Sequence, residues 1–232
     1  MTSALVLVHS PLTGPSVWQP AAGLLRARGH EVAVPSLGEA LEGEGPYYPR
    51  LAAAAAGQIR DQAPDATHLT LAAHSGAGAL LPAVADAARA PVRNAVYVDA
   101  LLPHPGVSWL ATAPDELRSR MRELTRDGAL APWHEWFPRG TVEALVPDAA
   151  QRTRFCAELP RVPERYFAEP APDSRALEPG SCAYLRLSET YEPQAATAER
   201  AGWPVRRLRA HHLSLLTSPE ATADALEELI AA

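Results

Sequence analysis

The stretch LTLAAHSGAGAL, residues 69–80, joins a short apolar run to a second one through a histidine, a serine and two glycines. The spacing predicts a buried strand over 68–73 and a helix over 76–88. Ser75 then lies between strand and helix, with the small residues Ala73 and Ala77 two positions away on either side. Close approach of the two elements forces a strained turn that exposes the serine as a nucleophile. The alternative is that Ser75 only caps the helix.

Strand and helix patterns alternate on both sides of this turn, which predicts an α/β fold with a mostly parallel sheet and helices on both faces. The alternation breaks in a stretch rich in proline and aromatic residues, where we expect several short helices without strands. We therefore predict a core domain from 1–102 and 181–232, and a helical cap at 103–180 inserted after the fourth recognisable strand. The other predicted strands are 4–8, 31–34, 93–98, 183–187 and 205–208, and the other predicted helices are 17–28, 48–62, 194–201 and 219–231.

Composition limits the classes of partner. The chain of 232 residues carries a formal net charge of -6 without a basic block, which argues against nucleic acid and anionic membranes and leaves a small molecule as the expected partner. Two cysteines, Cys156 and Cys182, are expected to be reduced packing residues. The N-terminal stretch has no basic segment and no apolar run long enough for a signal peptide, so we expect a cytoplasmic protein. The sequence does not indicate an oligomeric state.

A serine needs a base, and the candidates lie in AHHLSLLTSPE, residues 210–220. His211 and His212 follow a predicted strand and precede a predicted helix, so they share the carboxyl edge of the sheet with Ser75. We favour His212 as the base and keep His211 as the alternative. Both could also be loop histidines that hydrogen-bond to the backbone.

Three pieces of the chain resemble the α/β-hydrolase fold family: LVLVHSPLTGPSVW (5–18), AHSGAGAL (73–80) and AHHLSLLTSPE, in the order serine before histidine. The first piece looks most like the small methylesterase and hydroxynitrile-lyase branch, whose H-x-x-x-x-G-x-x-x-W loop is matched by His9, Gly14 and Trp18. The resemblance implies the α/β-hydrolase fold and a Ser-His-acid triad. It does not extend over the predicted cap.

The acid of such a triad has two candidates. The family usually places an aspartate after the late strand, but YLRLSETYEPQ (184–194) contains only glutamates there, with Glu189 as the candidate. Asp99, in VYVDALLPHPG (96–106), stands in a position similar to that of the acid in polyketide-synthase thioesterase domains. An aspartate after a buried strand is unfavourable unless it is paired, so Asp99 is favoured. A turn-capping role for Asp99, a solvated Glu189, and a site in which neither is the acid stay open.

The oxyanion hole is the second departure from the family pattern. Gly76, directly after the serine, is expected to supply one backbone N–H. The resembling enzymes take the second donor from the loop after the first strand, where Pro11 stands here and has no N–H. Either Leu12 donates its N–H, or Ser10 donates its hydroxyl, or the hole is incomplete.

Aromatic residues of the predicted cap, together with His74, are the expected substrate-binding residues, and packing of the cap onto the sheet is the alternative for the aromatic ones. The whole pattern predicts a serine hydrolase that cleaves a carboxylic ester or thioester of a small, largely apolar substrate, without metal or organic cofactor. A lyase, a cyclase or an acyltransferase, for example of secondary metabolism, and a ligand-binding protein with little turnover are the alternatives. The aromatic cap residues that we expect to bind substrate are Trp109, Trp133, Trp136 and Phe137.

Overall fold

Six parallel strands form the central sheet of the computed structural model, which describes residues 2–174 and 176–231. The strand order is β2-β1-β3-β4-β8-β9, and every neighbouring pair is parallel. The central strands are apolar and buried on both faces, as expected where helices cover a sheet on each side. The strands are β1 (Ser3–Val8), β2 (Glu31–Ala33), β3 (His68–His74), β4 (Val92–Val98), β8 (Cys182–Arg186) and β9 (Val205–Arg207).

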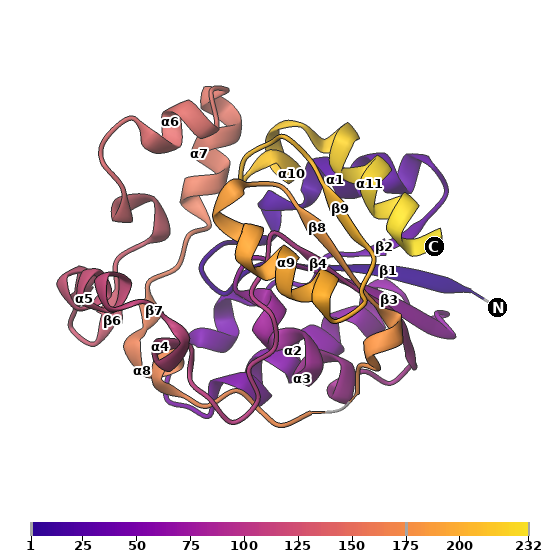
Figure 1. Cartoon of the computed structure of the whole chain (residues 1–232), viewed down its shortest axis with the longest axis horizontal. Coiled ribbons are helices and arrows are strands. Elements are labelled where there is room, and N and C mark those ends of the chain that lie inside the picture. The colour runs from indigo at the N-terminus through magenta and orange to yellow at the C-terminus, as the bar shows by residue number, and fades with distance from the viewer. Residues whose placement is uncertain (1, 175, 232) are drawn as a thin grey trace.

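Helices cover both faces of this sheet (Figure 1), so the fold is the predicted α/β arrangement. One face packs against α2 (Tyr47–Gln62), α3 (Ala77–Ala87) and α9 (Glu192–Arg200). The other face packs against α1 (Gln19–Ala27), α10 (Ser214–Thr217) and α11 (Pro219–Ala231). The short helix α10 was not among the predicted elements. The single-turn helices outside the connection from β4 to β8 are η1 (Pro15–Val17), η2 (Gly38–Leu41) and η5 (Glu189–Tyr191), and η4 (Pro179–Ser181) directly precedes β8.

Most of the chain between β4 and β8, residues 109–168, lies beyond the carboxyl ends of the strands, on the left in Figure 1. It contains short helices, as predicted, but also a small antiparallel sheet in the order β5-β6-β7. The prediction of no strands here was wrong because each of these strands has two residues, too few for an alternating pattern. Its elements are α4 (Trp109–Thr112), α5 (Asp115–Leu124), β5 (Thr125–Arg126), β6 (Ala129–Leu130), η3 (Trp133–Trp136), α6 (Thr141–Leu145), α7 (Ala149–Ala157), β7 (Val162–Pro163) and α8 (Glu164–Ala168).

Two glutamates of this insertion bind backbone N–H groups of the sheet-forming part. Glu158 accepts a hydrogen bond from the Ser16 N–H at 2.8 Å, and Glu169 accepts from the first N–H groups of α2, those of Tyr47 and Tyr48, at 2.7 and 3.0 Å. A carboxylate at a helix N-terminus satisfies otherwise unpaired donors. In the described part of the chain, no helix is both long and apolar enough to cross a membrane.

Candidate active site

Ser75 lies in the tight turn between β3 and α3, at the carboxyl edge of the sheet. Its φ of 58° is in the left-handed region that residues with side chains rarely adopt. The N–H groups of Gly78 and Leu101 donate to the Ser75 carbonyl oxygen at 3.2 and 3.0 Å and hold this conformation. The Ser75 side chain makes no capping hydrogen bond to α3 and lines a cavity instead. The turn therefore presents Oγ at the end of the strand.

Asp99 follows β4 directly, and its side chain is fully buried. Oδ1 accepts the backbone N–H groups of Leu187 and Ser188 at 2.8 and 2.9 Å. Oδ2 accepts the Ser188 hydroxyl at 2.6 Å and His212 Nδ1 at 2.8 Å. Burial alone would raise the pKa of Asp99, but the hydrogen bonds from His212 and Ser188 hold it below its ordinary value. The carboxylate is thus ionised and fully hydrogen-bonded.

The backbone at Asp99 is as constrained as its side chain. Its φ is 45°, again in the left-handed region, and its N–H donates to the Leu185 carbonyl oxygen at 2.7 Å. The hydroxyl of the buried Tyr184 accepts the N–H of Ala100 at 3.0 Å and donates to the Ala100 carbonyl oxygen at 2.7 Å. Tyr184 therefore fixes the turn that aims Asp99 at His212.

His212 lies on the loop between β9 and α10. Because Nδ1 donates to Asp99, Nε2 is left with the free lone pair. Three aromatic rings surround the imidazole: Tyr191 stacks parallel to it with a centroid distance of 5.0 Å, and the His74 and Trp133 rings lie at 4.5 and 6.3 Å. Ser75 Oγ makes its hydrogen bond to the Tyr191 hydroxyl, at 3.4 Å, and not to the His212 ring.

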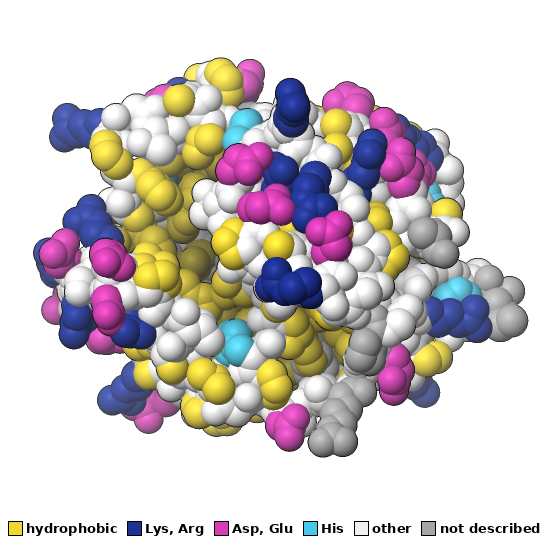
Figure 2. Space-filling model, viewed as in Figure 1, with side chains coloured by type: hydrophobic (Ala, Val, Ile, Leu, Met, Phe, Trp, Pro, Cys, Tyr) yellow, Lys and Arg dark blue, Asp and Glu magenta, His cyan; other side chains and the backbone are white. Residues whose placement is uncertain are grey.

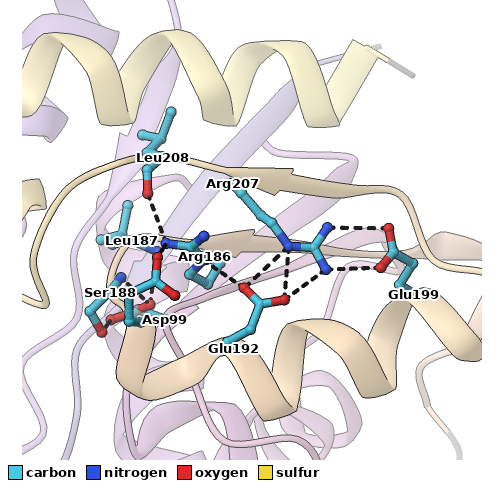
Figure 3. Close-up of polar contacts among 9 residues, drawn as sticks. Asp99, Arg186, Leu187, Ser188, Glu192, Glu199, Arg207 and Leu208 are labelled. Carbon is cyan, nitrogen blue, oxygen red and sulfur yellow. Dashed lines mark hydrogen bonds and ion pairs between the residues drawn. The ribbon is translucent and has the colours of Figure 1, made fainter.

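The segment that binds Asp99 is itself held by ion pairs (Figure 3). The guanidinium of Arg186, whose side chain is 9% exposed, pairs with Glu189 at 2.9 Å and with Glu192 at 3.0 Å, and donates to the Leu208 carbonyl oxygen. Arg207 pairs with the same Glu192 and with Glu199, one further carboxylate of α9. Arg186 thus joins the end of β8, the start of α9 and the end of β9, the three elements around His212.

The expected oxyanion donors are the Gly76 N–H and a group of Ser10 or Leu12. The Gly76 N–H donates to no acceptor in the part of the chain that the structure describes. A Cβ at Gly76 would lie 3.0 Å from Ser10 Oγ, so the Ser10 hydroxyl packs against Gly76, but Ser10 is fully buried and does not line the cavity that Ser75 and Gly76 line. The Leu12 N–H donates to Ser10 Oγ at 3.2 Å, which leaves the Ser10 proton free of partners among residues 2–174 and 176–231. A hydrogen bond from Leu12 to Ser10 therefore spans Pro11, which has no N–H of its own.

Ser75, Gly76 and His212 open into one cavity of about 450 Å³. The predicted aromatic residues of the insertion, Trp109, Trp133, Trp136 and Phe137, all line it. Figure 2 shows a hollow of hydrophobic side chains between α5 and the α6–α7 pair. Among the described residues, no Asp, Glu, Lys or Arg lines the cavity. The remaining lining residues are Leu12, Leu101, Leu117, Leu145, Ser188, Thr190, Tyr191 and His211.

Three other predicted candidates take no part in the hydrogen bond between His212 and Asp99. His74 is fully buried, its Nε2 bonds to the His212 carbonyl oxygen at 3.0 Å, and it does not line the cavity, because an inward position on β3 places it behind the His212 ring. Expecting it to bind substrate was therefore wrong. His211 lines the cavity, but its ring bonds to Leu213 N and Thr217 Oγ1, away from Asp99. The Glu189 side chain is 82% exposed and pairs with Arg186.

Sequence reasoning did not identify Tyr191, although it contacts both Ser75 and His212. The signal was present, since Tyr191 follows the strand that ends at Arg186, at the same edge as the other candidates. In the described part of the chain, no group of three or more His, Cys, Asp or Glu side chains could hold a metal ion.

Comparison with solved structures returns the same fold over nearly the whole chain. An extracellular alpha/beta-hydrolase from a Paenibacillus species, described as homologous in structure and function to tobacco Salicylic Acid Binding Protein 2, superposes with a TM-score of 0.76 at 18% identity, covering 99% of both chains. A pyrethroid hydrolase from Sphingobium faniae JZ-2 gives 0.71 at 20% identity, covering 100% of this chain and 98% of that one. Tomato Methylketone Synthase I, in complex with 2-tridecanone, gives 0.72 at 16% identity, covering 98% and 97%.

These identities establish the fold alone. A search of curated proteins found no match. The family model described as the alpha/beta hydrolase family matches residues 5–225, which include every strand of the large sheet except the first two residues of β1. The predicted resemblance is confirmed: the chain belongs to the alpha/beta hydrolase family.

Proposed function

We propose that this protein is a serine hydrolase that cleaves a carboxylic ester or thioester of a small, largely apolar substrate through an acyl-enzyme on Ser75. The observation that carries the proposal is the 2.8 Å hydrogen bond from His212 Nδ1 to the buried Asp99, beside the cavity that Ser75 lines. Asp99 fixes the tautomer in which His212 Nε2 accepts a proton, and it stabilises the imidazolium that forms. A base in that state converts a weak serine hydroxyl into a nucleophile.

The reaction follows from these roles. Ser75 Oγ attacks the carbonyl carbon while its proton passes to His212 Nε2, and the same proton then protonates the departing alcohol or thiol. Water, deprotonated by His212, releases the acyl group from Ser75. The bond between nucleophile and base often tightens only when substrate binds, so the present contact of Ser75 with Tyr191 is compatible with this sequence.

The developing oxyanion would be held by the Gly76 N–H and by one donor from the loop after β1, either the Ser10 hydroxyl or the N–H of Leu12, which lines the cavity. Support for Ser10 comes from the position of its Oγ beside Gly76 and from the Leu12 N–H that donates to it. A hydroxyl that accepts one hydrogen bond becomes a better donor of another. Either donor accommodates Pro11, which has no N–H.

The lining of the cavity supports a neutral substrate. It consists of tryptophan, phenylalanine and leucine side chains with a few uncharged polar groups, and its volume of about 450 Å³ is within the usual range for small-molecule sites. A charged group would lose its hydration there without gaining a partner of opposite charge. Esters with an aryl or alkyl acyl group are therefore expected to react at least tenfold faster, in kcat/KM, than esters whose acyl chain ends in a carboxylate.

The test is intact-mass measurement after incubation with a fluorophosphonate, in which an activated serine displaces fluoride. We expect one adduct on the wild type and none on Ser75→Ala. Circular dichroism on both proteins controls for folding. A folded wild type that forms no adduct would rule out the acyl-enzyme on Ser75.

A non-hydrolytic reaction on the same scaffold, such as a lyase or cyclase step, is the second candidate. The observation that favours it is the engagement of the Leu12 N–H with Ser10, which leaves Gly76 as the one free backbone donor found there among the described residues. A site with a weak oxyanion hole favours proton transfer over a tetrahedral intermediate. An unlabelled but folded wild type would support this candidate.

A further inference from the structure

Tyr191 is the side chain that touches both reacting groups of the site. Its hydroxyl lies 3.4 Å from Ser75 Oγ, and its ring stacks on the His212 imidazole with an angle of 2° between the two planes. It also lines the cavity. None of the proposed roles of Ser75, His212 and Asp99 uses this hydroxyl, so its position needs an explanation of its own.

Tyr191 is held both by ion pairs of its backbone turn and by contacts of its ring. It ends the single turn η5. The first residue of this turn, Glu189, and the residue after it, Glu192, both pair with the guanidinium of Arg186. Glu192 is held further by Arg207 at 3.0 Å (Figure 3). Stacking on His212 fixes the ring itself. A hydroxyl fixed in this way loses little freedom when it binds a reacting group.

The protonation state makes Tyr191 a donor. Burial raises the pKa of Tyr191 to about 12; the hydrogen bond with Ser75 opposes this rise, and the charge of Asp99 adds to it. The phenol therefore keeps its proton at every pH at which the protein would work. In the contact with Ser75 either hydroxyl can be the donor; once Ser75 gives its proton to His212, Tyr191 is left to donate and Oγ to accept.

We propose that Tyr191 is a catalytic residue that donates its hydrogen bond first to Ser75 Oγ and then to the oxygen of the leaving alcohol. The proposal rests on the serine-hydrolase function proposed above. The leaving oxygen is bonded to the same carbon as Oγ, so a hydroxyl that reaches Oγ also reaches this second oxygen after a small rotation. Tyr191 thereby stabilises the negative charge that develops on the leaving oxygen, which the backbone donors do not serve.

The proton balance does not involve the tyrosine proton. The bond between Oγ and the carbonyl carbon forms as the Ser75 proton moves to His212. The bond between that carbon and the alcohol oxygen then breaks as His212 returns the proton to the alcohol oxygen. Tyr191 keeps its own proton throughout and contributes a hydrogen bond that is strongest when the oxygen carries negative charge.

This role predicts a dependence on the leaving group. An alkoxide such as methoxide is a strong base and gains much from a donor, whereas 4-nitrophenolate leaves without help. We expect Tyr191→Phe to lower kcat/KM about 10- to 100-fold for alkyl esters, as for the loss of a hydrogen bond to a charged oxygen. For 4-nitrophenyl esters of the same acid, we expect a change of less than about 3-fold. Phenylalanine keeps the stacking on His212.

The experiment compares kcat/KM for paired methyl and 4-nitrophenyl esters of acetate, butyrate, octanoate and benzoate. The matched control is Tyr184→Phe, which removes a buried hydroxyl that orients the turn at Asp99 and does not reach Ser75. Tyr184→Phe should lower kcat/KM by the same factor for methyl and for 4-nitrophenyl esters. Thermal unfolding of each variant checks that it is folded.

Three outcomes overturn the assignment while leaving the hydrolase function intact. Tyr191→Phe could retain wild-type rates on methyl esters, or lose the same factor on both ester types, as a positioning residue would. The wild type could also hydrolyse only the nitrophenyl esters. A wild type that hydrolyses no ester and forms no fluorophosphonate adduct instead contradicts the proposed function itself, and the role of Tyr191 with it.

Discussion

The Asp99 carboxylate has no accepting capacity left over, and this makes its amide variant informative. In Asp99→Asn, the side-chain NH₂ would face one of the donors that now bind the carboxylate, from Leu187, Ser188 or His212. The His212 tautomer with a free Nε2 would lose its support. We expect kcat to fall about 10³- to 10⁴-fold, measured as ester hydrolysis, with fluorophosphonate labelling slowed in parallel.

Glu189→Gln is the matched control for this variant, because Glu189 was the other candidate acid. Its exposed side chain pairs with Arg186 and does not reach His212. We expect its activity to stay within about 3-fold of the wild type, since exposed ion pairs contribute little. An equal or larger loss in Glu189→Gln than in Asp99→Asn would contradict the assignment of the acid.

Ser10 offers a second prediction at this scale, and it separates the two possible oxyanion donors. If the Ser10 hydroxyl is the donor, Ser10→Ala should lower kcat about 100-fold or more, the usual effect of losing one such donor. The same variant frees the Leu12 N–H, which now donates to Ser10 Oγ. Unchanged or increased kcat in Ser10→Ala would therefore assign the role to Leu12. Steady-state ester hydrolysis distinguishes the two results.

At the scale of the elements, Gly78 determines how closely α3 can approach the turn after β4. A Cβ at Gly78 would lie 1.9 Å from the Leu101 carbonyl oxygen, which is backbone and cannot move aside cheaply. We expect Gly78→Ala to lower the free energy of unfolding by about 2 kcal/mol or more, measured by urea denaturation.

The control for Gly78 is another helical glycine. Gly23 lies inside α1, and a Cβ there would meet nothing within 4 Å. Because alanine is the better helix former, Gly23→Ala should leave stability unchanged or raise it by up to about 1 kcal/mol. A destabilisation by Gly78→Ala no larger than that of Gly23→Ala would mean that α3 can shift away from the Leu101 loop.

The elements themselves were largely readable from the sequence. The predicted strands and helices around Ser75 and the last helix agree with β3, α3 and α11 within one or two residues, because long apolar periods and flanking prolines mark them. The two-residue strands β5, β6 and β7 carry no period and were missed. The short helix α10 was missed for the same reason, since four residues make only one turn.

Whole-molecule topology explains which parts of the site were predictable. Parallel strands bring all their carboxyl ends to one edge, so Ser75, Asp99 and His212 could be expected to meet although they lie far apart in the chain. What the topology leaves open is orientation. That His74 turns inward, and that Tyr191 reaches Ser75, depend on side-chain directions that strand order does not fix.

Two histidines lie in the interior of the molecule without a positive charge. His9 and His74 are both fully buried. Burial lowers the pKa of His9 to about 4, despite its hydrogen bond to the Ser10 carbonyl oxygen and the charge of Glu158. Burial and the neighbouring His212 lower the pKa of His74 well below its ordinary value. Both side chains therefore take up a proton near pH 6.5 in the unfolded chain and only at lower pH in the fold.

Stability should consequently decrease on acidification. Between pH 6.5 and 4 the unfolded chain binds more protons than the native protein, so the free energy of unfolding falls as the pH falls, by up to about 3 kcal/mol from His9 alone. Urea unfolding at intervals from pH 7.5 to 4.5 measures this slope. In His9→Gln, the slope should become shallower because one of the two buried imidazoles is gone. A free energy of unfolding that stays level from pH 7 to 5 would mean that both histidines are hydrated or charged in the native state.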